Sequence, residues 1–212
     1  MGRSLQNSGT IGIALGIVVG YLAGSVSFGY WLVRLFKHED VRTQGSGNIG
    51  ATNVWRTFGP RYGIPVILLD VAKGFVPTLV ATLEAGHVAG ALTGGAAMLG
   101  HWRPLFLGFA KGGKTVATYG GALLGLAPLV GLVGAVVWIA VFAATRYASV
   151  ASILAALSLP IAALLLGEPW PVLVFVSAAA LGVLILHRGN LKRLRAGTET
   201  RVQLRRKPAT TT

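Results

Sequence analysis

Cationic and hydrogen-bonding side chains stand beside glycines in three segments of the sequence. Residues 45–56 read Gly-Ser-Gly-Asn-Ile-Gly-Ala-Thr-Asn-Val-Trp-Arg, residues 108–115 read Gly-Phe-Ala-Lys-Gly-Gly-Lys-Thr, and His187 precedes Asn190 by one helical turn. Arg offers a two-pronged donor to phosphate, Lys offers a point charge, and a glycine-rich turn that opens a helix adds backbone N–H groups. These residue types indicate a site for phosphate-bearing ligands. The first segment could instead be only a set of turns that caps a short helix.

Two of these segments match nucleotide-binding patterns without the context that such patterns need. Residues 45–50 fit G-x-G-x-x-G, and residues 108–115 fit G-x-x-x-x-G-K-[ST]. Both patterns bind nucleotides only between a strand and a helix of a parallel sheet, and the second also requires carboxylates that hold magnesium. No stretch of this sequence can supply such a sheet. We therefore expect neither a dinucleotide site nor an NTPase, and only the anion-binding chemistry of the turns remains.

The composition places the chain in a membrane. Only 12% of the 212 residues are charged, 53% are hydrophobic, and the mean hydropathy is +0.67, whereas an average soluble domain carries about 25% charged residues. The net charge of +13 accompanies apolar runs that a soluble basic protein could not expose, so we expect no nucleic-acid partner. The absence of cysteine excludes disulfides, thiolate chemistry and cysteine-based zinc sites.

The apolar segments predict an all-α integral membrane protein with seven transmembrane helices, some of them short. The predicted spans are residues 11–35, 63–83, 88–109, 115–126, 128–145, 150–166 and 170–186. Residues 115–145 are long for one helix, but Gly-Leu-Ala-Pro at 125–128 offers a break. Among the connections, Lys and Arg occur only in alternate ones, and cytoplasmic loops collect these residues. The predicted amino terminus is therefore outside and the carboxyl terminus cytoplasmic.

The first predicted span is longer than the core of a signal peptide and lacks an Ala-x-Ala cleavage pattern, so we expect it to be retained. Small residues recur on one of its faces, which favours close packing within the bundle over a dimer seam. These residues are Gly12, Gly16, Gly20 and Gly24. At the other end of the chain, residues 192–207 are interpreted as a basic anchor against anionic lipid head groups rather than a lipid-sensing helix.

Charged residues inside an apolar helix are candidates for function, and the second predicted span contains Asp70 and Lys73. At i and i+3 they share a helix face and can neutralise each other, so an ion pair that only fixes helix packing is an equally supported interpretation. Taken alone, His101 is better interpreted as a structural histidine than as a base. Clusters dominated by cations, without paired carboxylates, favour direct binding of anionic substrates and predict no metal ion and no cofactor.

Taken in order, these motifs resemble the three signature motifs of the bacterial acyl-phosphate:glycerol-3-phosphate acyltransferase family. The first motif is residues 45–56, the second is Asp-x-x-Lys-Gly at 70–74, and the third is Gly-His-x-x-Pro-x-Phe-Leu-x-Phe-x-Lys-Gly-Gly-Lys-x-Val-Ala-Thr at 100–118. A closing His-Arg-x-Asn-x-x-Arg-Leu at 187–194 also matches, so the resemblance covers most of the chain. One departure is Thr115, where the family usually has Gly.

The resemblance implies a seven-helix enzyme of the bacterial inner membrane with its active site at the cytoplasmic face. Such enzymes transfer an acyl chain from acyl phosphate to the sn-1 hydroxyl of glycerol 3-phosphate. The products are lysophosphatidic acid and inorganic phosphate, and the reaction is the first acylation step of phospholipid synthesis. The resemblance assigns no protein base, because the phosphate of the substrate is thought to assist deprotonation.

Carried over by position, the resemblance assigns roles to individual residues. Those expected to bind glycerol 3-phosphate are Ser46, Arg56, Lys114, Ser152, His187 and Asn190. Those expected to contact the head of acyl phosphate are Thr52, Asn53, Gly112 and Gly113, the last two through their backbone. Those expected to support the site are Asn48, Gly50, Asp70, Lys73, Gly74, His101 and Lys111.

A seven-span transporter of a phosphorylated metabolite is the alternative function. It also needs buried polar residues and anion sites, but its external connections would have to admit the solute, and here they are short and carry no basic residues. We expect residues 1–199 to form a single membrane-embedded domain in contact with lipids, with a monomer favoured. Residues 200–212 are expected to form a flexible basic cytoplasmic tail.

Overall fold

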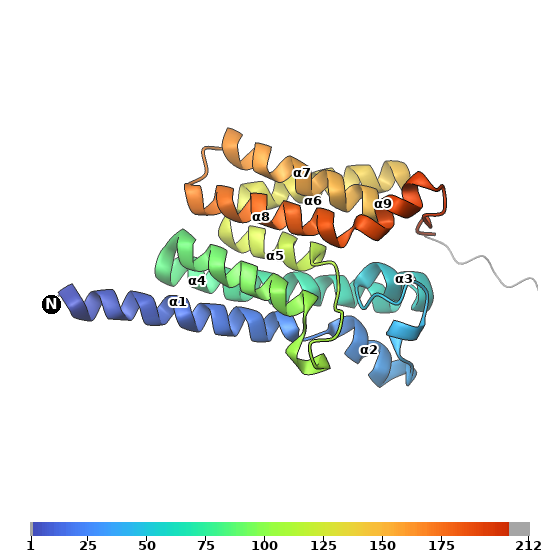
Figure 1. The fold of residues 1–212 in the computed structure, drawn as a ribbon, viewed down its shortest axis with the longest axis horizontal. Coiled ribbons are helices and arrows are strands. Elements are labelled where there is room, and N and C mark those ends of the chain that lie inside the picture. Colours follow the sequence, from blue (N-terminus) through green and yellow to red (C-terminus); the bar gives the residue numbers. More distant parts are fainter. Residues whose placement is uncertain (1, 204–212) are drawn as a thin grey trace, which may run out of the picture.

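The computed structural model describes residues 2–203, and side chains from Thr10 onward. All regular secondary structure in this range is helical (Figure 1). The helices are α1 (Gly2–Ser25), α2 (Phe28–Lys37), α3 (Ala51–Phe58), α4 (Pro60–Trp102), α5 (Val116–Leu126), α6 (Pro128–Thr145), α7 (Ala148–Leu165), α8 (Trp170–Leu186) and α9 (Arg188–Arg195). Short 3-10 turns lie at Val41–Thr43 and Leu105–Leu107. The all-helical fold class is confirmed.

Helix α4 is a hairpin of two arms that reverse at Gly86, where φ is +80°. A Cβ added to Gly90 would lie 2.0 Å from Thr82 Oγ1, and one added to Gly94 would lie 3.1 Å from Thr78 Oγ1, so the arms run side by side. The reversal falls in the predicted connection between residues 83 and 88. The second arm ends at Trp102, not at the predicted residue 109, because Pro104 lacks the N–H that a continuing helix would need.

The predicted first span, residues 11–35, lies within an apolar segment, Thr10–Lys37, that is long enough to cross a membrane, but it is not one continuous helix. Helix α1 ends at Ser25 and α2 begins at Phe28. Lys73 from α4 donates from Nζ to the carbonyl oxygen of Val26 at 2.8 Å, so a side chain supplies the partner that the broken helix lacks.

The break at residues 125–128 is confirmed, because α5 ends at Leu126 and α6 begins at Pro128. The predicted ends of α6 and α8 agree with the structure, and α7 begins two residues before the predicted start. Helices α5 to α8 share one core that includes Leu123, Val130, Leu159 and Val176. This core fixes the positions at which the connecting loops leave the bundle.

Glycines set the close approach of α1, α4 and α5. A Cβ at Gly20 would lie 2.4 Å from the carbonyl oxygen of Thr93, and one at Gly24 would lie 2.0 Å from that of Ala97. Most of the small-residue face of α1 therefore packs against the second arm of α4, which confirms packing within the bundle over a dimer seam. Gly74 has the same role toward α5, since its Cβ would lie 2.1 Å from the carbonyl oxygen of Thr118.

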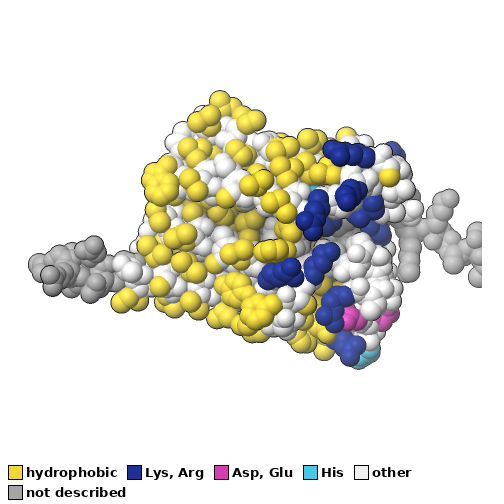
Figure 2. All heavy atoms as spheres, viewed as in Figure 1, with side chains coloured by type: hydrophobic (Ala, Val, Ile, Leu, Met, Phe, Trp, Pro, Cys, Tyr) yellow, Lys and Arg dark blue, Asp and Glu magenta, His cyan; other side chains and the backbone are white. Residues whose placement is uncertain are grey.

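Length and composition allow four helical segments among the described residues to cross a membrane, or five if α8 and α9, bent by 53°, count as one. Hydrophobic side chains cover most of the visible surface, and Lys and Arg gather at the end that carries α2, α3 and α9 (Figure 2). The protein is therefore an integral membrane protein with one basic end.

A short segment after α9 folds back onto the basic end, and we call residues 198–202 the strap. Thr198 N donates to the carbonyl oxygen of Arg193 at 2.8 Å, and Val202 N donates to that of Arg146 at 2.9 Å. Val202 is buried. The predicted boundary of the domain at residue 199 stays a prediction, and most of the predicted tail, residues 204–212, lies outside the described residues.

Candidate active site

The candidate site lies at the basic end, where α3, the loop before α5, the start of α7, α9 and the strap meet. At its centre Lys114 Nζ donates to Asn190 Oδ1 at 2.6 Å. Asn190 Nδ2 in turn donates to Glu199 Oε1 at 2.6 Å. The carboxylate also accepts from Ser149 Oγ at 2.8 Å and from Arg193 Nε at 2.7 Å. Two of the predicted glycerol 3-phosphate ligands are therefore in direct contact.

Arg56 joins the same cluster from α3, which places its guanidinium toward the strap. Its NH2 group donates to the carbonyl oxygen of Thr200 at 3.4 Å, and its buried Nε has no partner among the described residues. Burial lowers the pKa of Arg56. The negative charge of Glu199 acts to raise this pKa, and the positive charge of Arg193 lowers it further. A buried N–H without a partner is costly, so this guanidinium can gain by donating a hydrogen bond to an anionic ligand.

Lys114 is the cation whose protonation is most sensitive to its surroundings. Burial lowers its pKa to about 8; Glu199 acts in the opposite direction, and Arg193, Arg56 and Lys111 lower the pKa further. A fraction of the Lys114 side chains is therefore neutral in mildly alkaline solution, while a bound phosphate would favour the ammonium. Lys111, predicted to support the site, is exposed in the loop before Lys114.

His187 follows α8 directly and is buried beside Lys114. Burial and the charge of Lys114 lower the pKa of His187 to about 4, so its imidazole is neutral at pH 7. Nδ1 lies 2.8 Å from the carbonyl oxygen of Val183, and a carbonyl can only accept, so Nδ1 carries the proton. Nε2 is then an acceptor, which suits the hydroxyl of a ligand better than its phosphate.

Ser152 lies one helical turn after Ser149 on α7 and is buried. Its hydroxyl donates to the carbonyl oxygen of Ala148 at 2.7 Å and accepts from Trp138 Nε1 at 3.1 Å. In this structure Ser149, not the predicted Ser152, contacts Glu199 in the cationic cluster.

The glycine-rich loop before α3 is organised by the buried amide of Asn53. Asn53 Nδ2 donates to the carbonyl oxygens of Gln44 at 3.0 Å and Asn48 at 2.9 Å, and Asn53 Oδ1 accepts from Ser46 N at 2.9 Å. Asn48 Oδ1 accepts from Gly50 N at 2.7 Å, which starts α3. The amide of Asn53 therefore organises the loop, and its predicted contact with acyl phosphate stays a prediction.

Two other predicted ligands from this region remain accessible. The side chain of Ser46 is exposed at the tip of the loop, and Thr52 is half-buried in the first turn of α3. Residues 45–50 form turns that precede the short helix α3, as either interpretation of residues 45–56 requires. The anion-binding interpretation of Ser46 and Thr52 stays a prediction.

The backbone N–H groups of Gly112 and Gly113 do not form the predicted open cradle. Gly112 N donates to the carbonyl oxygen of Trp102 at 2.9 Å, and Gly113 N donates to that of His101 at 3.0 Å. A Cβ at Gly113 would also lie 1.9 Å from His101 Nε2. These glycines let the loop pair with the end of α4, and their predicted contact with acyl phosphate stays a prediction.

Thr115 marks the departure from the family motifs, and it stands in a left-handed backbone conformation with φ of +63°. Gly adopts this conformation without a steric penalty, which explains the Gly that the motif usually has here. A β-branched side chain is disfavoured there. Thr115 Oγ1 is also buried with no hydrogen-bond partner among residues 2–203.

Thr115→Gly is expected to raise the free energy of unfolding by about 1 kcal/mol. It removes the Cβ that the left-handed conformation disfavours by about 1–2 kcal/mol, and this gain is opposed by about 0.5–1 kcal/mol of added entropy in the unfolded chain. Thermal unfolding in detergent measures the effect. Thr115→Ala is the control, because Ala removes the hydroxyl but keeps the Cβ; a Gly variant no more stable than the Ala variant would contradict the strain.

Asp70, Lys73 and His101 form a second cluster inside the bundle. Asp70 Oδ1 lies 2.7 Å from Lys73 Nζ and 3.7 Å from His101 Nδ1, and all three side chains are buried. Lys73 also donates to Val26, so the pair ties α4 to the break between α1 and α2. These contacts favour the packing interpretation of the pair over direct contact with a substrate. His101 connects this cluster to the loop before α5, because its carbonyl oxygen accepts from Gly113 N and its ring packs against Gly113.

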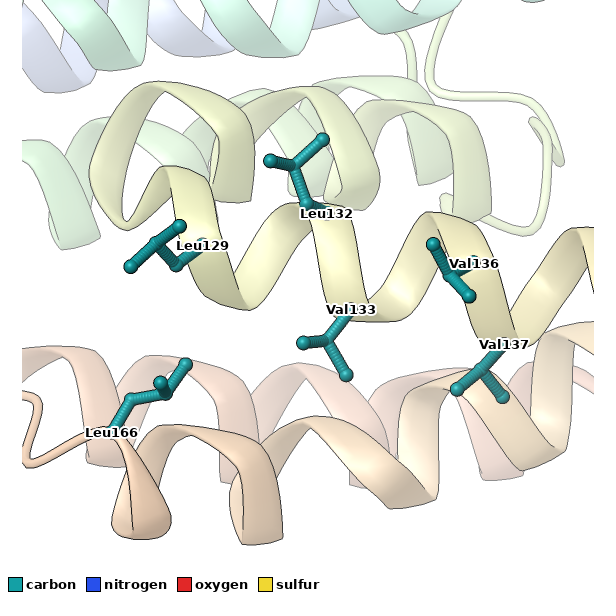
Figure 3. Close-up of a pocket in the computed structure, with 6 residues that line it drawn as sticks. All are labelled: Leu129, Leu132, Val133, Val136, Val137 and Leu166. Atoms are coloured by element: carbon teal, nitrogen blue, oxygen red, sulfur yellow. The ribbon is translucent and has the colours of Figure 1, made fainter.

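Two hollows lie on the described surface away from the cationic cluster. An apolar groove of about 350 Å³ runs between α6 and the end of α7 (Figure 3). Its lining residues are Leu129, Leu132, Val133, Val136, Val137 and Leu166. A second hollow, of about 310 Å³, lies beside Lys37 and Gln44. Neither is lined by the cationic cluster.

Glu199, Ser149 and Arg193 belong to the cluster but were not among the residues predicted for the site. Arg193 was within the closing motif, and Glu199 is one of only six acidic residues in the chain. An acid this rare, six positions after an Arg, was a usable signal for an ion pair. Ser149 gave no comparable signal in the sequence.

An apolar helical bundle with a cationic cluster at one end defines an integral membrane protein with a candidate anion site. The chain belongs to the glycerol-3-phosphate acyltransferase family, whose model matches residues 14–197. This confirms the family that the motifs resemble.

Relatives and solved structures are similar over nearly their whole length. The glycerol-3-phosphate acyltransferase of Desulforudis audaxviator is 45% identical over 92% of this chain and 98% of its own. That of Aquifex aeolicus is 43% identical over 87% and 96%. The integral membrane glycerol 3-phosphate acyltransferase PlsY superposes in its glycerol 3-phosphate form with a TM-score of 0.86, at 40% identity over 90% of this chain and 96% of that one. Its lysophosphatidic acid form gives 0.83 at 38% identity, over 91% and 96%.

Proposed function

We propose that this protein transfers an acyl chain from acyl phosphate to the sn-1 hydroxyl of glycerol 3-phosphate, releasing lysophosphatidic acid and inorganic phosphate. The observation that carries the proposal is the pair of cations at the basic end. Lys114 is held there by Asn190, and the Nε of Arg56 has no partner among the described residues, so both cations can bind one phosphate. The similar PlsY structures in glycerol 3-phosphate and lysophosphatidic acid forms support this choice of substrate and product.

The proposed roles follow from the donors and acceptors in the cluster. Arg56 and Lys114 bind the phosphate of glycerol 3-phosphate, with Ser46 as an exposed donor from the loop. Nε2 of the neutral His187 accepts a hydrogen bond from a hydroxyl group of glycerol 3-phosphate. Thr52 binds the head of acyl phosphate. Acyl phosphate is already activated, so the residues mainly hold two mutually repelling anions close together, and no protein base is assigned.

We propose seven spans, with the amino terminus outside and the carboxyl terminus in the cytoplasm of a bacterial inner membrane. The two arms of α4 count separately because Gly86 reverses the chain, and α5 adds a short crossing. The basic end then faces the cytoplasm, because cytoplasmic loops collect Lys and Arg. We further propose that residues 1–199 form one monomeric domain followed by a basic tail.

Cysteine labelling tests this orientation in a chain without native cysteine. His87→Cys, in the exposed reversal of α4 opposite the basic end, is expected to react in intact cells with a membrane-impermeant maleimide from outside. Thr43→Cys, in the loop before α3, is expected to react only after the cells are opened. Reaction of Thr43→Cys alone in intact cells would reverse the topology.

Release of inorganic phosphate from palmitoyl phosphate by purified protein tests the function. Release is expected to depend on glycerol 3-phosphate, to match the formation of lysophosphatidic acid, and to persist in a divalent-metal chelator. Loss of turnover in the chelator with recovery in magnesium would contradict the metal-free mechanism. Flux of glycerol 3-phosphate into proteoliposomes without acyl transfer would favour the transporter.

A further inference from the structure

The carboxylate of Glu199 is enclosed by the residues proposed to bind glycerol 3-phosphate. Its side chain is only 7% exposed although it belongs to the strap at the end of the described chain. Hydrogen bonds also hold the backbone on either side of Glu199. Thr198 N donates to α9, the carbonyl oxygen of Thr200 accepts from Arg56, and Val202 N donates to the carbonyl oxygen of Arg146. The carboxylate is therefore held in place from several directions.

Glu199 determines how the amide of Asn190 is oriented. Asn190 Nδ2 donates to Glu199 Oε1 at 2.6 Å, which leaves Asn190 Oδ1 to accept from Lys114 Nζ at 2.6 Å. An ammonium has only donors, so it requires the oxygen of the amide and not its nitrogen. A carboxylate can only accept, whereas an amide at position 199 could also donate, so replacing the carboxylate removes the contact that fixes this choice.

Glu199 also neutralises part of a dense positive charge. Its hydrogen bonds from Asn190, Ser149 and Arg193 keep its pKa below the ordinary value, although burial acts in the opposite direction. The charged groups that face Lys114 are Glu199, Arg193, Arg56 and Lys111, and Glu199 is the one among them that favours the ammonium. The neighbouring His187 is neutral at pH 7.

We propose that Glu199 is a positioning residue for the glycerol 3-phosphate site, where its carboxylate holds Asn190 and Arg193 and, through Asn190, the ammonium of Lys114. This inference rests on the proposed function. The strap then contributes Glu199 to the site. Ser149 of α7 donates a hydrogen bond to this carboxylate and so attaches it to the helical bundle.

Kinetics of Glu199→Gln in the full chain test the proposal, with palmitoyl phosphate and glycerol 3-phosphate titrated separately. The KM for glycerol 3-phosphate is expected to rise about tenfold, while kcat and the KM for palmitoyl phosphate change less than about threefold. The alkaline fall in kcat/KM for glycerol 3-phosphate, which reports the free enzyme, is expected to move to lower pH because Lys114 loses its supporting charge.

Three further variants separate positioning from folding. Glu199→Asp keeps the charge on a shorter side chain and is expected to recover part of the affinity. Ser149→Ala keeps the carboxylate and is expected to raise the KM less than Glu199→Gln, which keeps the proposal testable if the Gln variant does not fold. Glu84→Gln, an exposed acid at the reversal of α4, is the matched control and is expected to match the wild type.

Each contrary outcome has a distinct meaning. A lower KM in Glu199→Gln would show that the carboxylate competes with the phosphate, and a loss confined to kcat would point to direct action on the reacting hydroxyl. Unchanged constants and pH profile would remove Glu199 from the site. All three overturn the inference while the acyltransferase function stands, whereas a wild type without glycerol 3-phosphate-dependent phosphate release overturns that function itself.

Discussion

Asp70→Asn is expected to lower the free energy of unfolding by about 3–5 kcal/mol, because it leaves a charged Lys73 unpaired inside the bundle. Lys73 Nζ lies 2.7 Å from Asp70 and donates to Val26, so loss of the carboxylate also loosens the break between α1 and α2. Thermal unfolding and the yield of folded protein in detergent measure the loss, and activity is expected to fall with the amount of folded protein.

A double variant provides the control for this ion pair. Asp70→Asn combined with Lys73→Met removes both charges and is expected to recover part of the stability, although the carbonyl of Val26 then lacks its donor. Full thermal stability of Asp70→Asn together with complete loss of turnover would contradict the packing interpretation and indicate a direct part in catalysis.

Lys114→Ala and Arg56→Ala are each expected to lower kcat/KM for glycerol 3-phosphate by roughly 10- to 150-fold. This range corresponds to loss of a charge-assisted hydrogen bond of about 1.5–3 kcal/mol. Arg56→Lys is expected to recover only part of the loss, because an ammonium cannot replace a two-pronged donor. Initial rates over a titration of both substrates measure the change, and raised glycerol 3-phosphate is expected to restore part of the rate.

Exposed basic residues at the same end supply the matched controls. Lys192→Ala on α9 and Arg61→Ala at the start of α4 remove the same charges outside the cluster and are expected to leave both KM values unchanged. Thermal unfolding is expected to be similar in all four alanine variants. Wild-type constants in Lys114→Ala and Arg56→Ala would remove both residues from the site.

Much of the fold was predictable because local sequence determines where these apolar helices end. Gly125 to Pro128 marked the break before α6, and the segment from Glu84 to His87 marked the reversal of α4. The break at Val26 was not predictable, because no proline or charged residue interrupts the run there. It depends on Lys73, which lies 47 residues later in the chain.

The chemistry of the site was predictable to a similar extent. Arg56, Lys114 and Asn190 stood out as donors for an anion, and the structure brings them to one end of the bundle. The uses of Gly112 and Gly113 were not predictable, since the same glycine-rich spacing serves an open anion cradle and a close pairing with His101 and Trp102. Only the neighbouring backbone decides between these two uses.

The distance in sequence between Arg56 and Thr200, 144 residues, has a consequence for how the protein is made. The ribosome finishes every apolar helix before it adds the strap, so a chain released just before residue 198 would contain the whole bundle without the last part of its site. Such a product would insert and persist in the bilayer while lacking Glu199. We therefore expect a premature stop codon in the strap to lower catalytic competence more than abundance in the membrane.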